Sequence, residues 1–356
     1  MFAVNARFLT QPITGVQRFA LEISRELQLL CHKDELKFFA PHNVLLESEA
    51  QELGVEIIGS HTGHLWEQFD LPRHLKKIGS PLLLNFCNTA PVLYSNKIST
   101  LHDITYIRYP KSYSNAFRYF YRFLIPLVLK SSKLLFTVSD FSKAEISNYY
   151  RIPNQKITVV YNAVGCNFHP QSNENLNKEN YLLAVSSVKE CKNFEMIVKA
   201  FEGVSKQMDN LKLFIVGDLK SGSFSSMDLN ALTGNSRVKL LGRVSDSELV
   251  DLYSNALAFL FPSLYEGFGI PVLEAQSCGC PVIASNVASM PEVLVESADL
   301  VNPHNIDDWI HAICNIVTDT DHRNQLKELG FRNVERFSWK QSANKVLNRA
   351  AEGAKK

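Results

Sequence analysis

The alternation of two residue patterns along the chain most restricts the fold that it can adopt. Short β-branched and aromatic runs, typical of buried strands, alternate with longer stretches whose apolar residues have helical spacing. This alternation predicts parallel sheets with helices on both faces, an α/β architecture. In the first half we expect strands at residues 2–5, 37–40, 56–58, 82–86, 98–101, 134–138 and 157–160. In the second half we expect them at residues 181–186, 211–216, 238–241, 258–261 and 282–284.

A polar stretch divides this pattern in two. Residues 170–180 read PQSNENLNKEN and nearly lack apolar side chains, which is typical of a linker. At 356 residues, two separate cores are favoured over one. We therefore predict two doubly wound, Rossmann-like domains, at 1–170 and 181–338, joined by a linker at 171–180. A last helix follows in residues 339–356.

Composition limits the class of partner. The formal net charge of +1 provides no overall field for nucleic acid, so we expect no nucleic-acid partner. The seven cysteines include no C-x-x-C pair, which favours reduced thiols in a cytoplasmic protein over a disulfide framework or a zinc site. The N-terminal residues MFAVN read as a strand and not as a signal peptide. Four basic residues and a proline interrupt the most apolar stretch, 117–138, so we expect a helix and a strand there and no membrane span.

The strongest local signal is the segment SLYEGFGIPVLE at residues 263–274. It follows an apolar strand and contains two glycines before Pro271, which suits the first position of a helix. The backbone N–H groups of Gly267, Phe268 and Gly269 would then point outward at a helix N-terminus, where the helix dipole favours an anion.

Two carboxylates flank this loop. Glu266 projects from it, and Glu274 lies about one turn into the helix. A carboxylate accepts hydrogen bonds from vicinal hydroxyls, so the pair suits recognition of a sugar and a ribose. The alternative is that Glu266 caps the helix and that Glu274 is a solvated helix residue.

A second signal is the stretch VSSVKECKN at residues 185–193, after the first strand of the second half. It includes Ser187 and Lys192 and opens a helix. A lysine there suits a diphosphate through a charge-assisted hydrogen bond, worth roughly 1.5–3 kcal/mol. A solvated lysine at the start of a helix is the alternative.

Two weaker signals lie in the first half, at the ends of predicted strands. Thr14 and Gly15 begin a helix after the stretch NARFL, and a simple turn glycine is as consistent with this spacing. His102 and Asp103 end an apolar strand, where open parallel sheets bind ligands. The His ring can donate or accept a proton, and the carboxylate can orient it.

In combination these motifs resemble the retaining glycosyltransferases of family 4, which have the GT-B fold. Glu266 and Glu274 form the E-x7-E pattern of that family, and the surrounding FPS, EA, CGCPV and PE segments and the late FSW also match it. The likeness covers essentially the whole chain. It implies two Rossmann-like domains that face each other across a cleft, with acceptor bound by the first and donor by the second. It also implies that the helix at 339–356 crosses back to the first domain.

The resemblance assigns roles to the motif residues of the second half. Glu266 contacts hydroxyls of the donor sugar, the Gly267–Phe268–Gly269 loop holds sugar and phosphate, and Glu274 binds the ribose. The remaining donor-binding residues by this likeness are Lys192 and Ser187 near the diphosphate, and Arg243 and Val244 near the nucleobase. For Arg243 an ordinary surface position is as consistent with the sequence.

In the first half, the resemblance places Gly15 at the donor diphosphate and His102 and Asp103 at the reacting sugar. The chain departs from the family pattern at two positions. Ser186 stands where the family has a glycine, and Cys191 stands where it has an arginine. The arginine role is therefore not carried over, and Lys189 is a candidate to replace it.

Residues 108–123, RYPKSYSNAFRYFYRF, mix basic and aromatic side chains. Core packing explains part of this run. The alternative is a surface for an anionic, lipid-linked acceptor at the inner face of the membrane, with the protein peripheral to it.

The resemblance thus implies a retaining hexosyltransferase of cell-surface polysaccharide synthesis, similar to bacterial mannosyltransferases. Its donor is a nucleotide-sugar, with GDP-mannose the preferred expectation, and its acceptor is a saccharide or a lipid-linked saccharide. No metal or other cofactor is implied, because no D-x-D motif follows a strand. The alternatives are a GT-B sugar-nucleotide epimerase and a non-catalytic subunit that binds a sugar-nucleotide.

Overall fold

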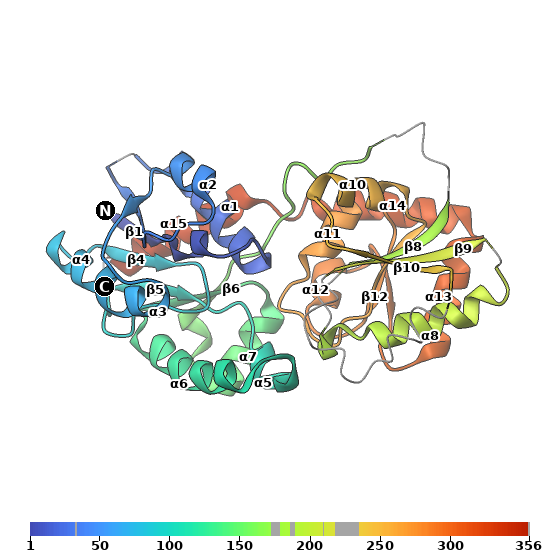
Figure 1. The fold of residues 1–356 in the computed structure, drawn as a ribbon, viewed down its shortest axis with the longest axis horizontal. Coiled ribbons are helices and arrows are strands. Elements are labelled where there is room, and N and C mark those ends of the chain that lie inside the picture. The colour runs from blue at the N-terminus through green and yellow to red at the C-terminus, as the bar shows by residue number, and fades with distance from the viewer. Residues whose placement is uncertain (33, 172–178, 186–188, 209, 218–234, 355–356) are drawn as a thin grey trace. The chain divides into compact units, whose positions relative to one another are not determined.

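The computed structural model describes residues 1–356 except 33, 172–178, 186–188, 209, 218–234 and 355–356. The chain forms two compact units (Figure 1). The first contains Met1–Ile107, Ser114–Asn162 and Ser338–Lys356, and the second contains Arg108–Tyr113 and Ala163–Phe337. Most of the predicted linker, and Ser187, lie outside the described residues.

The first unit has a seven-stranded sheet in which every strand pair is parallel. Its order is β3-β2-β1-β4-β5-β6-β7, with Val4 of β1 paired to Phe38 on one side and to Leu84 on the other. The strands are β1 (Phe2–Asn5), β2 (Leu36–Ala40), β3 (Glu56–Ile57), β4 (Leu82–Asn85), β5 (Lys97–Thr100), β6 (Leu134–Thr137) and β7 (Ile157–Val159).

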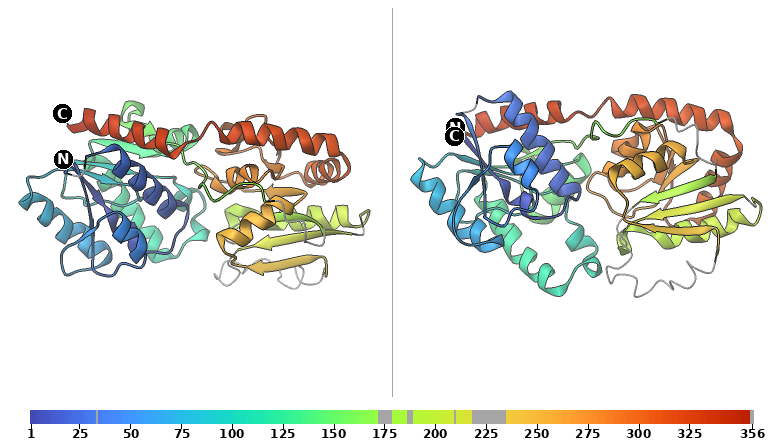
Figure 2. Two further views of the ribbon diagram at one scale, coloured as in Figure 1. Left: turned by 90° about the horizontal axis from the view of Figure 1, so that it is seen from above. Right: turned by 45° about the horizontal axis from the view of Figure 1, so that its top comes forward.

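Helices cover both faces of this sheet (Figures 1 and 2). The helix α15 packs beside α1, where the rings of Trp339 and Phe19 lie 6.1 Å apart, and α6 and α7 lie on the opposite face. The helical segments are η1 (Ala6–Thr10), α1 (Gly15–Leu30), α2 (Glu47–Glu52), α3 (Gly63–Leu65), the π-helical turn η2 (Trp66–Asp70), α4 (Leu71–Lys77), α5 (Thr105–Arg108), η3 (Pro110–Ser112), α6 (Asn115–Ser131), α7 (Asp140–Tyr150), η4 (Asn154–Lys156) and α15 (Trp339–Ala354).

The predicted helix in the apolar stretch 117–138 is confirmed as α6. Ser114 caps it by accepting from the N–H of Phe117, and Pro126 lies inside it. The strand β6 follows, as expected. None of the helices that the structure describes combines the length and the apolarity needed to cross a bilayer.

The second unit has a six-stranded sheet, and its strand pairs are again all parallel. The order is β10-β9-β8-β11-β12-β13. The strands are β8 (Asn180–Val185), β9 (Leu211–Val216), β10 (Val238–Gly242), β11 (Ala258–Phe261), β12 (Val282–Ser285) and β13 (Asp299–Val301).

Helices flank this sheet on both faces as well (Figure 1). The helices α8 and α13 pack together on one face around the fully buried Trp309 and Phe201, and α10, α11 and α14 cover the other. The described segments are η5 (Glu190–Lys192), α8 (Phe194–Ser205), α10 (Asp246–Asn255), α11 (Ile270–Ser277), α12 (Met290–Leu294), α13 (Ile306–Thr318) and α14 (Thr320–Val334).

The predicted α/β class with two parallel sheets is confirmed. Each end of a predicted strand lies within one residue of the observed end. The prediction missed β13, a short edge strand that begins with two partly exposed residues, Asp299 and Leu300. It also missed the short helices α2, α5 and α12.

Candidate functional site

The order of strands in the second sheet locates a binding edge. The chain runs outward from β8 to β9 and β10 on one side, and from β11 to β12 and β13 on the other. Ligands of open parallel sheets bind outside the carboxyl ends of the strands where the order reverses, here between β8 and β11. The loop after β8 carries Lys192, and the loop after β11 carries Glu266.

These two residues are in contact. The Nζ of Lys192 forms an ion pair with Oε1 of Glu266, and their side chains are 17% and 13% exposed. Lys192 is mostly shielded from water, so it is not a solvated lysine. Glu266 does not cap α11, because the N-cap position of that helix is Gly269. A cation suited to phosphate and a carboxylate suited to hydroxyls therefore lie side by side, partly shielded from water.

The backbone joins the two loops. The backbone N–H of Leu264 donates to the carbonyl of Cys191 at 2.7 Å. The side-chain amide of Asn193 donates to the carbonyl oxygens of Pro262 and Pro303 at 3.3 and 2.9 Å. Asn193 has a left-handed conformation, with φ of 53°, which turns the chain from η5 into α8.

Cys191 occupies the position where the family pattern has arginine, and its side chain is buried. A buried thiol does not supply a positive charge. Lys189, the candidate replacement, has its Nζ 4.8 Å from the centre of the Tyr113 ring. Lys192 is thus the basic residue of this loop that contacts Glu266.

Hydrogen bonds from Ser289 hold the loop that contains Gly267 and Gly269. The hydroxyl of Ser289 donates to the carbonyl oxygens of Glu266 and Phe268, both at 3.1 Å. Gly269 is the N-cap of α11 with φ of 93°, and a Cβ there would lie 2.5 Å from Cε of Met290. The positive φ favours glycine at this position, and a Cβ there would also require the end of the Met290 side chain to shift. The helix begins at Ile270, one residue earlier than predicted.

Glu274 lies on the second turn of α11 and is only 7% exposed, so its interpretation as a solvated helix residue is wrong. Burial and the nearby charge of Glu274 raise the pKa of the Cys278 thiol to about 12. The same two causes raise the pKa of Tyr253. Acidic side chains are rarely buried to this degree without a specific reason.

The predicted nucleobase residues lie farther along the sheet. Arg243, which is exposed, and Val244, which is half-buried, directly follow β10. They are at the same carboxyl edge as the two loops, but β10 is the outermost strand and β9 separates it from β8.

In the first unit, the strand order reverses between β1 and β4. Gly15, exposed, is the first residue of α1, in the connection that follows β1. Thr14 occupies the N-cap position, but its hydroxyl contacts the side chain of Gln17 and caps no backbone group.

His102 follows β5 at the same carboxyl edge and is 5% exposed. Its Nε2 lies 2.9 Å from the carbonyl oxygen of Phe86, which only accepts, so Nε2 carries the proton and Nδ1 is the acceptor. Burial lowers the pKa of His102, which keeps the ring neutral at pH 7. Its backbone N–H donates to the side chain of Asn88 at 2.9 Å.

Asp103 has a different contact from the one expected. Its carboxylate accepts from the N–H of Thr105 at 2.8 Å, at the start of α5. Within the described part of the chain, no hydrogen bond joins Asp103 to the ring of His102. The Phe86 carbonyl and Asn88 hold His102 instead.

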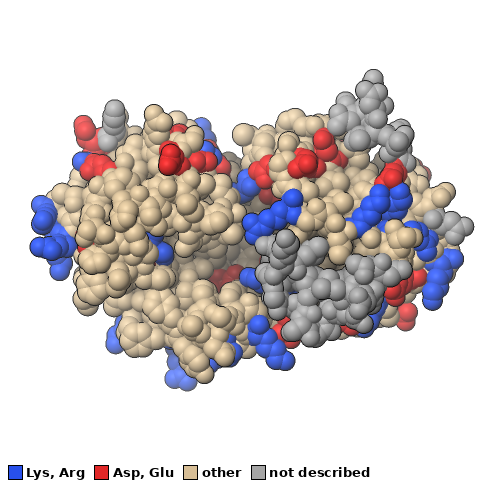
Figure 3. Space-filling model, in the orientation of Figure 1, with Lys and Arg blue, Asp and Glu red and all other residues tan. Residues whose placement is uncertain are grey.

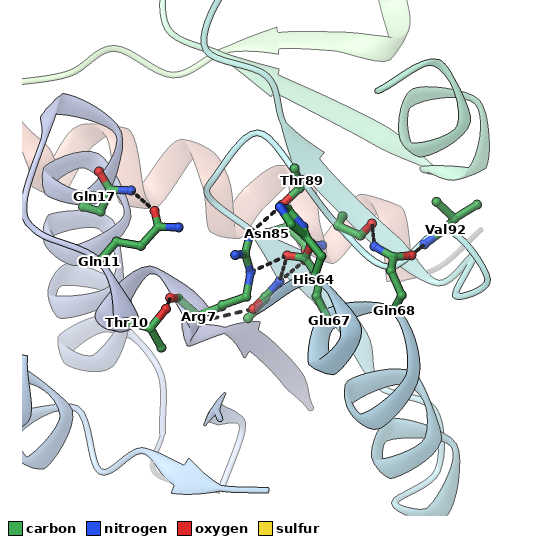
Figure 4. Close-up of polar contacts among 12 residues, drawn as sticks. Arg7, Thr10, Gln11, Gln17, His64, Glu67, Gln68, Asn85, Thr89 and Val92 are labelled. Atoms are coloured by element: carbon green, nitrogen blue, oxygen red, sulfur yellow. Dashed lines mark hydrogen bonds and ion pairs between the residues drawn. The ribbon is translucent and has the colours of Figure 1, made fainter. Parts of the chain in front are cut away.

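The sequence predicts that residues 88–91, which end a strand, line the acceptor side, but it does not predict the buried polar cluster that Thr89 joins at the carboxyl ends of β1 and β4 (Figure 4). Arg7 donates through Nε to Glu67 at 3.1 Å and through Nη2 to Thr89 at 2.7 Å. Asn5 donates to Glu67 at 2.9 Å and to Asn85 at 3.0 Å. An arginine directly after a buried strand was a signal for this cluster, but nothing in the sequence links it to Glu67, which lies 60 residues later.

Comparison with known proteins agrees with this arrangement. A family model described as Glycosyltransferase Family 4 matches residues 13–168, and one described as Glycosyl transferases group 1 matches residues 167–332. An O-antigen chain mannosyltransferase, RfbU, of Salmonella typhimurium is 36% identical over 68% of this chain and 67% of its own length. The O-antigen chain mannosyltransferase B of Escherichia coli is 27% identical over 95% of this chain and 96% of its own.

A solved structure shares the fold. The crystal structure of HepE from Anabaena, in complex with UDP and glucose, superposes with a TM-score of 0.76 at 16% identity, over 98% of this chain and 99% of that one. The two parallel sheets are therefore those of the GT-B fold. From the two family models and the relatives, the chain belongs to glycosyltransferase family 4 and is a glycosyltransferase.

Proposed function

We propose that this protein transfers mannose from GDP-mannose to a saccharide or lipid-linked saccharide acceptor in cell-surface polysaccharide synthesis, with retention of the anomeric configuration. The observation that carries the proposal is the ion pair of Lys192 and Glu266 at the reversal point of the second sheet. The choice of mannose is supported by two relatives that are O-antigen mannosyltransferases. A nucleotide-sugar donor is supported by HepE, whose structure holds UDP and glucose.

The second unit contributes the donor-binding residues. Lys192 neutralises the diphosphate, the loop of Gly267, Phe268 and Gly269 binds phosphate and sugar at the N-terminus of α11, and Glu266 accepts from sugar hydroxyls. The remaining roles are ribose binding by Glu274, phosphate binding by Ser187, and nucleobase contacts by Arg243 and Val244.

The first unit contributes Gly15 beside the diphosphate and His102 beside the transferred sugar. In the reaction the acceptor oxygen bonds to the anomeric carbon on the face that the diphosphate leaves. The bond from that carbon to the phosphate oxygen breaks, and the leaving oxygen takes the acceptor proton. No residue is assigned as a covalent nucleophile. No metal is required, because Lys192 and the helix N-terminus balance the phosphate charge.

A transfer assay with Lys192→Ala tests this proposal. The variant should lower the rate of mannosyl transfer at least a hundredfold and weaken GDP binding, because the diphosphate loses its cation. Lys199→Ala, which removes an exposed lysine of α8, is the matched control and should behave as wild type. EDTA should leave the wild-type rate within twofold.

Other outcomes would identify the alternatives. Consumption of the sugar-nucleotide with isomerised donor and no glycoside would indicate an epimerase. Binding of GDP-mannose without any turnover would indicate a non-catalytic subunit. Full transfer activity in Lys192→Ala would contradict the donor site itself.

We also propose that α6 contacts the membrane surface that carries the acceptor. Tyr119 and Phe123 on α6 are 72% and 71% exposed, and Leu93, in the connection between β4 and β5, is 76% exposed. Figure 3 shows uncharged and basic side chains along the lower edge of the first unit, where α6 lies in Figure 1. Aromatic and basic side chains together suit an anionic bilayer surface.

Vesicle sedimentation tests this contact. Wild type should bind vesicles containing anionic lipid more than neutral ones, and the double variant Tyr119→Ser, Phe123→Ser should lose most of that binding. Tyr149→Ser, at an exposed tyrosine of α7, is the control. Equal binding by the double variant would refute the membrane contact and leave the transfer reaction untouched.

A further inference from the structure

The cluster of Arg7, Glu67 and Thr89 lies at the reversal point of the first sheet. Arg7 follows β1, and Thr89 follows β4, the two strands between which the order reverses. This is the edge at which doubly wound sheets bind ligands. Glu67 reaches the cluster from the π-helical turn η2. Such turns are rare in proteins as a whole, but those that occur are often at functional sites.

Stability alone does not explain this buried ion pair. Arg7 is 9% exposed and Glu67 is 1% exposed. An apolar pair of similar volume is often as stable as a buried ion pair or more so, since removing two charges from water costs several kcal/mol per ion. Although burial acts to raise the pKa of Glu67, the charge of Arg7 and contacts from His64 and Thr89 lower it to about 2. The pair is therefore ionised at neutral pH.

A small pocket opens beside the pair. Its lining residues are Asn5, Arg7, Phe8, Gln11, Glu67 and Cys87. About 20 Å³ is available for the centre of a water-sized group, which is enough for roughly one such group. Within the described residues, Nη1 of Arg7 has no hydrogen-bond partner, so the guanidinium retains donors for a ligand.

The charges of the lining residues determine which chemical group the pocket can bind. A phosphate or carboxylate would meet the negative charge of Glu67 as well as the positive charge of Arg7. A hydroxyl donates and accepts at once, so it can donate to the carboxylate of Glu67 and accept from the guanidinium of Arg7. The lining thus favours a neutral hydroxyl and disfavours an anion.

We propose that this pocket is an acceptor subsite, in which one hydroxyl or hydroxymethyl group of the acceptor sugar binds between Arg7 and Glu67. The inference rests on the glycosyl transfer proposed above and names residues that select its acceptor. A direct connection to the reacting residues supports it. Thr89 accepts from Arg7, and the preceding residue, Asn88, accepts from the backbone of His102. The stretch 88–89 therefore couples the position of the pocket to that of His102.

Binding of simple glycosides tests the proposal. The probes are the methyl α-glycosides of mannose, glucose and galactose, observed by saturation-transfer NMR in the presence of GDP. At least one should bind to wild type. Gln11→Trp, at the exposed rim of the pocket, should weaken that binding at least tenfold by filling the space. Gln28→Trp, at an exposed glutamine of α1 outside the pocket, is the matched control and should bind as wild type.

A second variant tests the charge argument. Glu67→Gln preserves shape but leaves Arg7 uncompensated, so inorganic phosphate should displace the glycoside from this variant and not from wild type. Circular dichroism establishes that each variant is folded, and Gln11→Trp decides the matter if Glu67→Gln is not. Calorimetry with GDP should give affinities within twofold of wild type for both variants.

The outcomes separate this inference from the proposed function. Unchanged glycoside binding in Gln11→Trp, or no binding of any probe to wild type, would overturn the subsite. Absence of GDP release from GDP-mannose by wild type would instead contradict the mannosyl transfer. Displacement of the glycosides from wild type by inorganic phosphate, with GDP present to occupy the donor site, would show that the pocket holds an anion and would also overturn the proposal.

Discussion

Lys192 and Cys191 are adjacent in the sequence, but their side chains lie in different environments. The lysine amine contacts Glu266, while the cysteine thiol is buried where the family pattern has an arginine. The proposed donor site therefore has one fewer cation near the diphosphate than that pattern would provide. We propose that the N-terminus of α11 and Lys189, whose ammonium lies over the ring of Tyr113, compensate for it.

Glu274 allows a test of the ribose contact. Glu274→Gln should weaken GDP binding roughly tenfold, about 1.4 kcal/mol, because an amide accepts less strongly than a carboxylate from the ribose hydroxyls. The glutamine keeps the volume of this buried side chain, so the fold should persist. Calorimetry with GDP provides the measurement. Glu292→Gln on α12 is a control for a mutation outside the proposed contact. Unchanged GDP affinity in Glu274→Gln would remove Glu274 from the donor site.

His102 is predicted to act on the reacting sugar and not on the nucleotide. His102→Ala should reduce kcat for mannosyl transfer at least a hundredfold, because a contact to the transferred sugar is lost. GDP affinity should stay within twofold of wild type. Steady-state kinetics and calorimetry separate the two effects. Full kcat in the variant would show that His102 has no role in transfer and serves only to contact the Phe86 carbonyl.

At the scale of elements, the Arg7–Glu67 pair ties η1 to η2. Because the pKa of Glu67 is lowered to about 2, the folded state binds fewer protons than the unfolded state below about pH 4.5. The stabilisation from this group is thus present above pH 4.5 and is lost as the pH falls toward 2. Glu67→Gln should destabilise the protein by about 3–5 kcal/mol at pH 7, since it leaves the charge of Arg7 buried without its partner.

Urea unfolding at several pH values checks this prediction. The difference in the free energy of unfolding between wild type and Glu67→Gln should be constant from pH 7 to 5 and should shrink below pH 4.5. Glu52→Gln removes the partner of Arg25 in an exposed pair and should change stability by less than about 1 kcal/mol. A difference that grows as the pH falls would contradict the lowered pKa.

The elements themselves were largely predictable from sequence, but their contacts were not. Strands such as β4 and β11 are buried on both faces and read as continuous apolar runs, which made them visible. The edge strand β13 lacks such a run. The segments α3, η2 and α4 follow one another without a break, and sequence spacing does not reveal the π-helical turn between the two α-helices. That turn positions Glu67, so its place in the proposed acceptor pocket could not be predicted from the sequence.

At the scale of the whole molecule, each of the two units has its own parallel sheet and its own reversal point. The two family models divide the chain similarly, at 13–168 and 167–332. Motif residues after β8 and β11 were predictable as one site because adjacent parallel strands end at the same edge. The burial of Glu274 depends on packing around α11, which sequence spacing does not specify.

The proposed reaction forms a new glycosidic bond from GDP-mannose with retained configuration. Purified protein with GDP-mannose, in which the sugar is α-linked, and a methyl α-glycoside acceptor tests it directly, with the product identified by NMR at its anomeric carbon. We predict an α-linked mannoside and one GDP released for each bond formed. A β-linked product would contradict retention, and release of GDP without any glycoside would contradict the transfer itself.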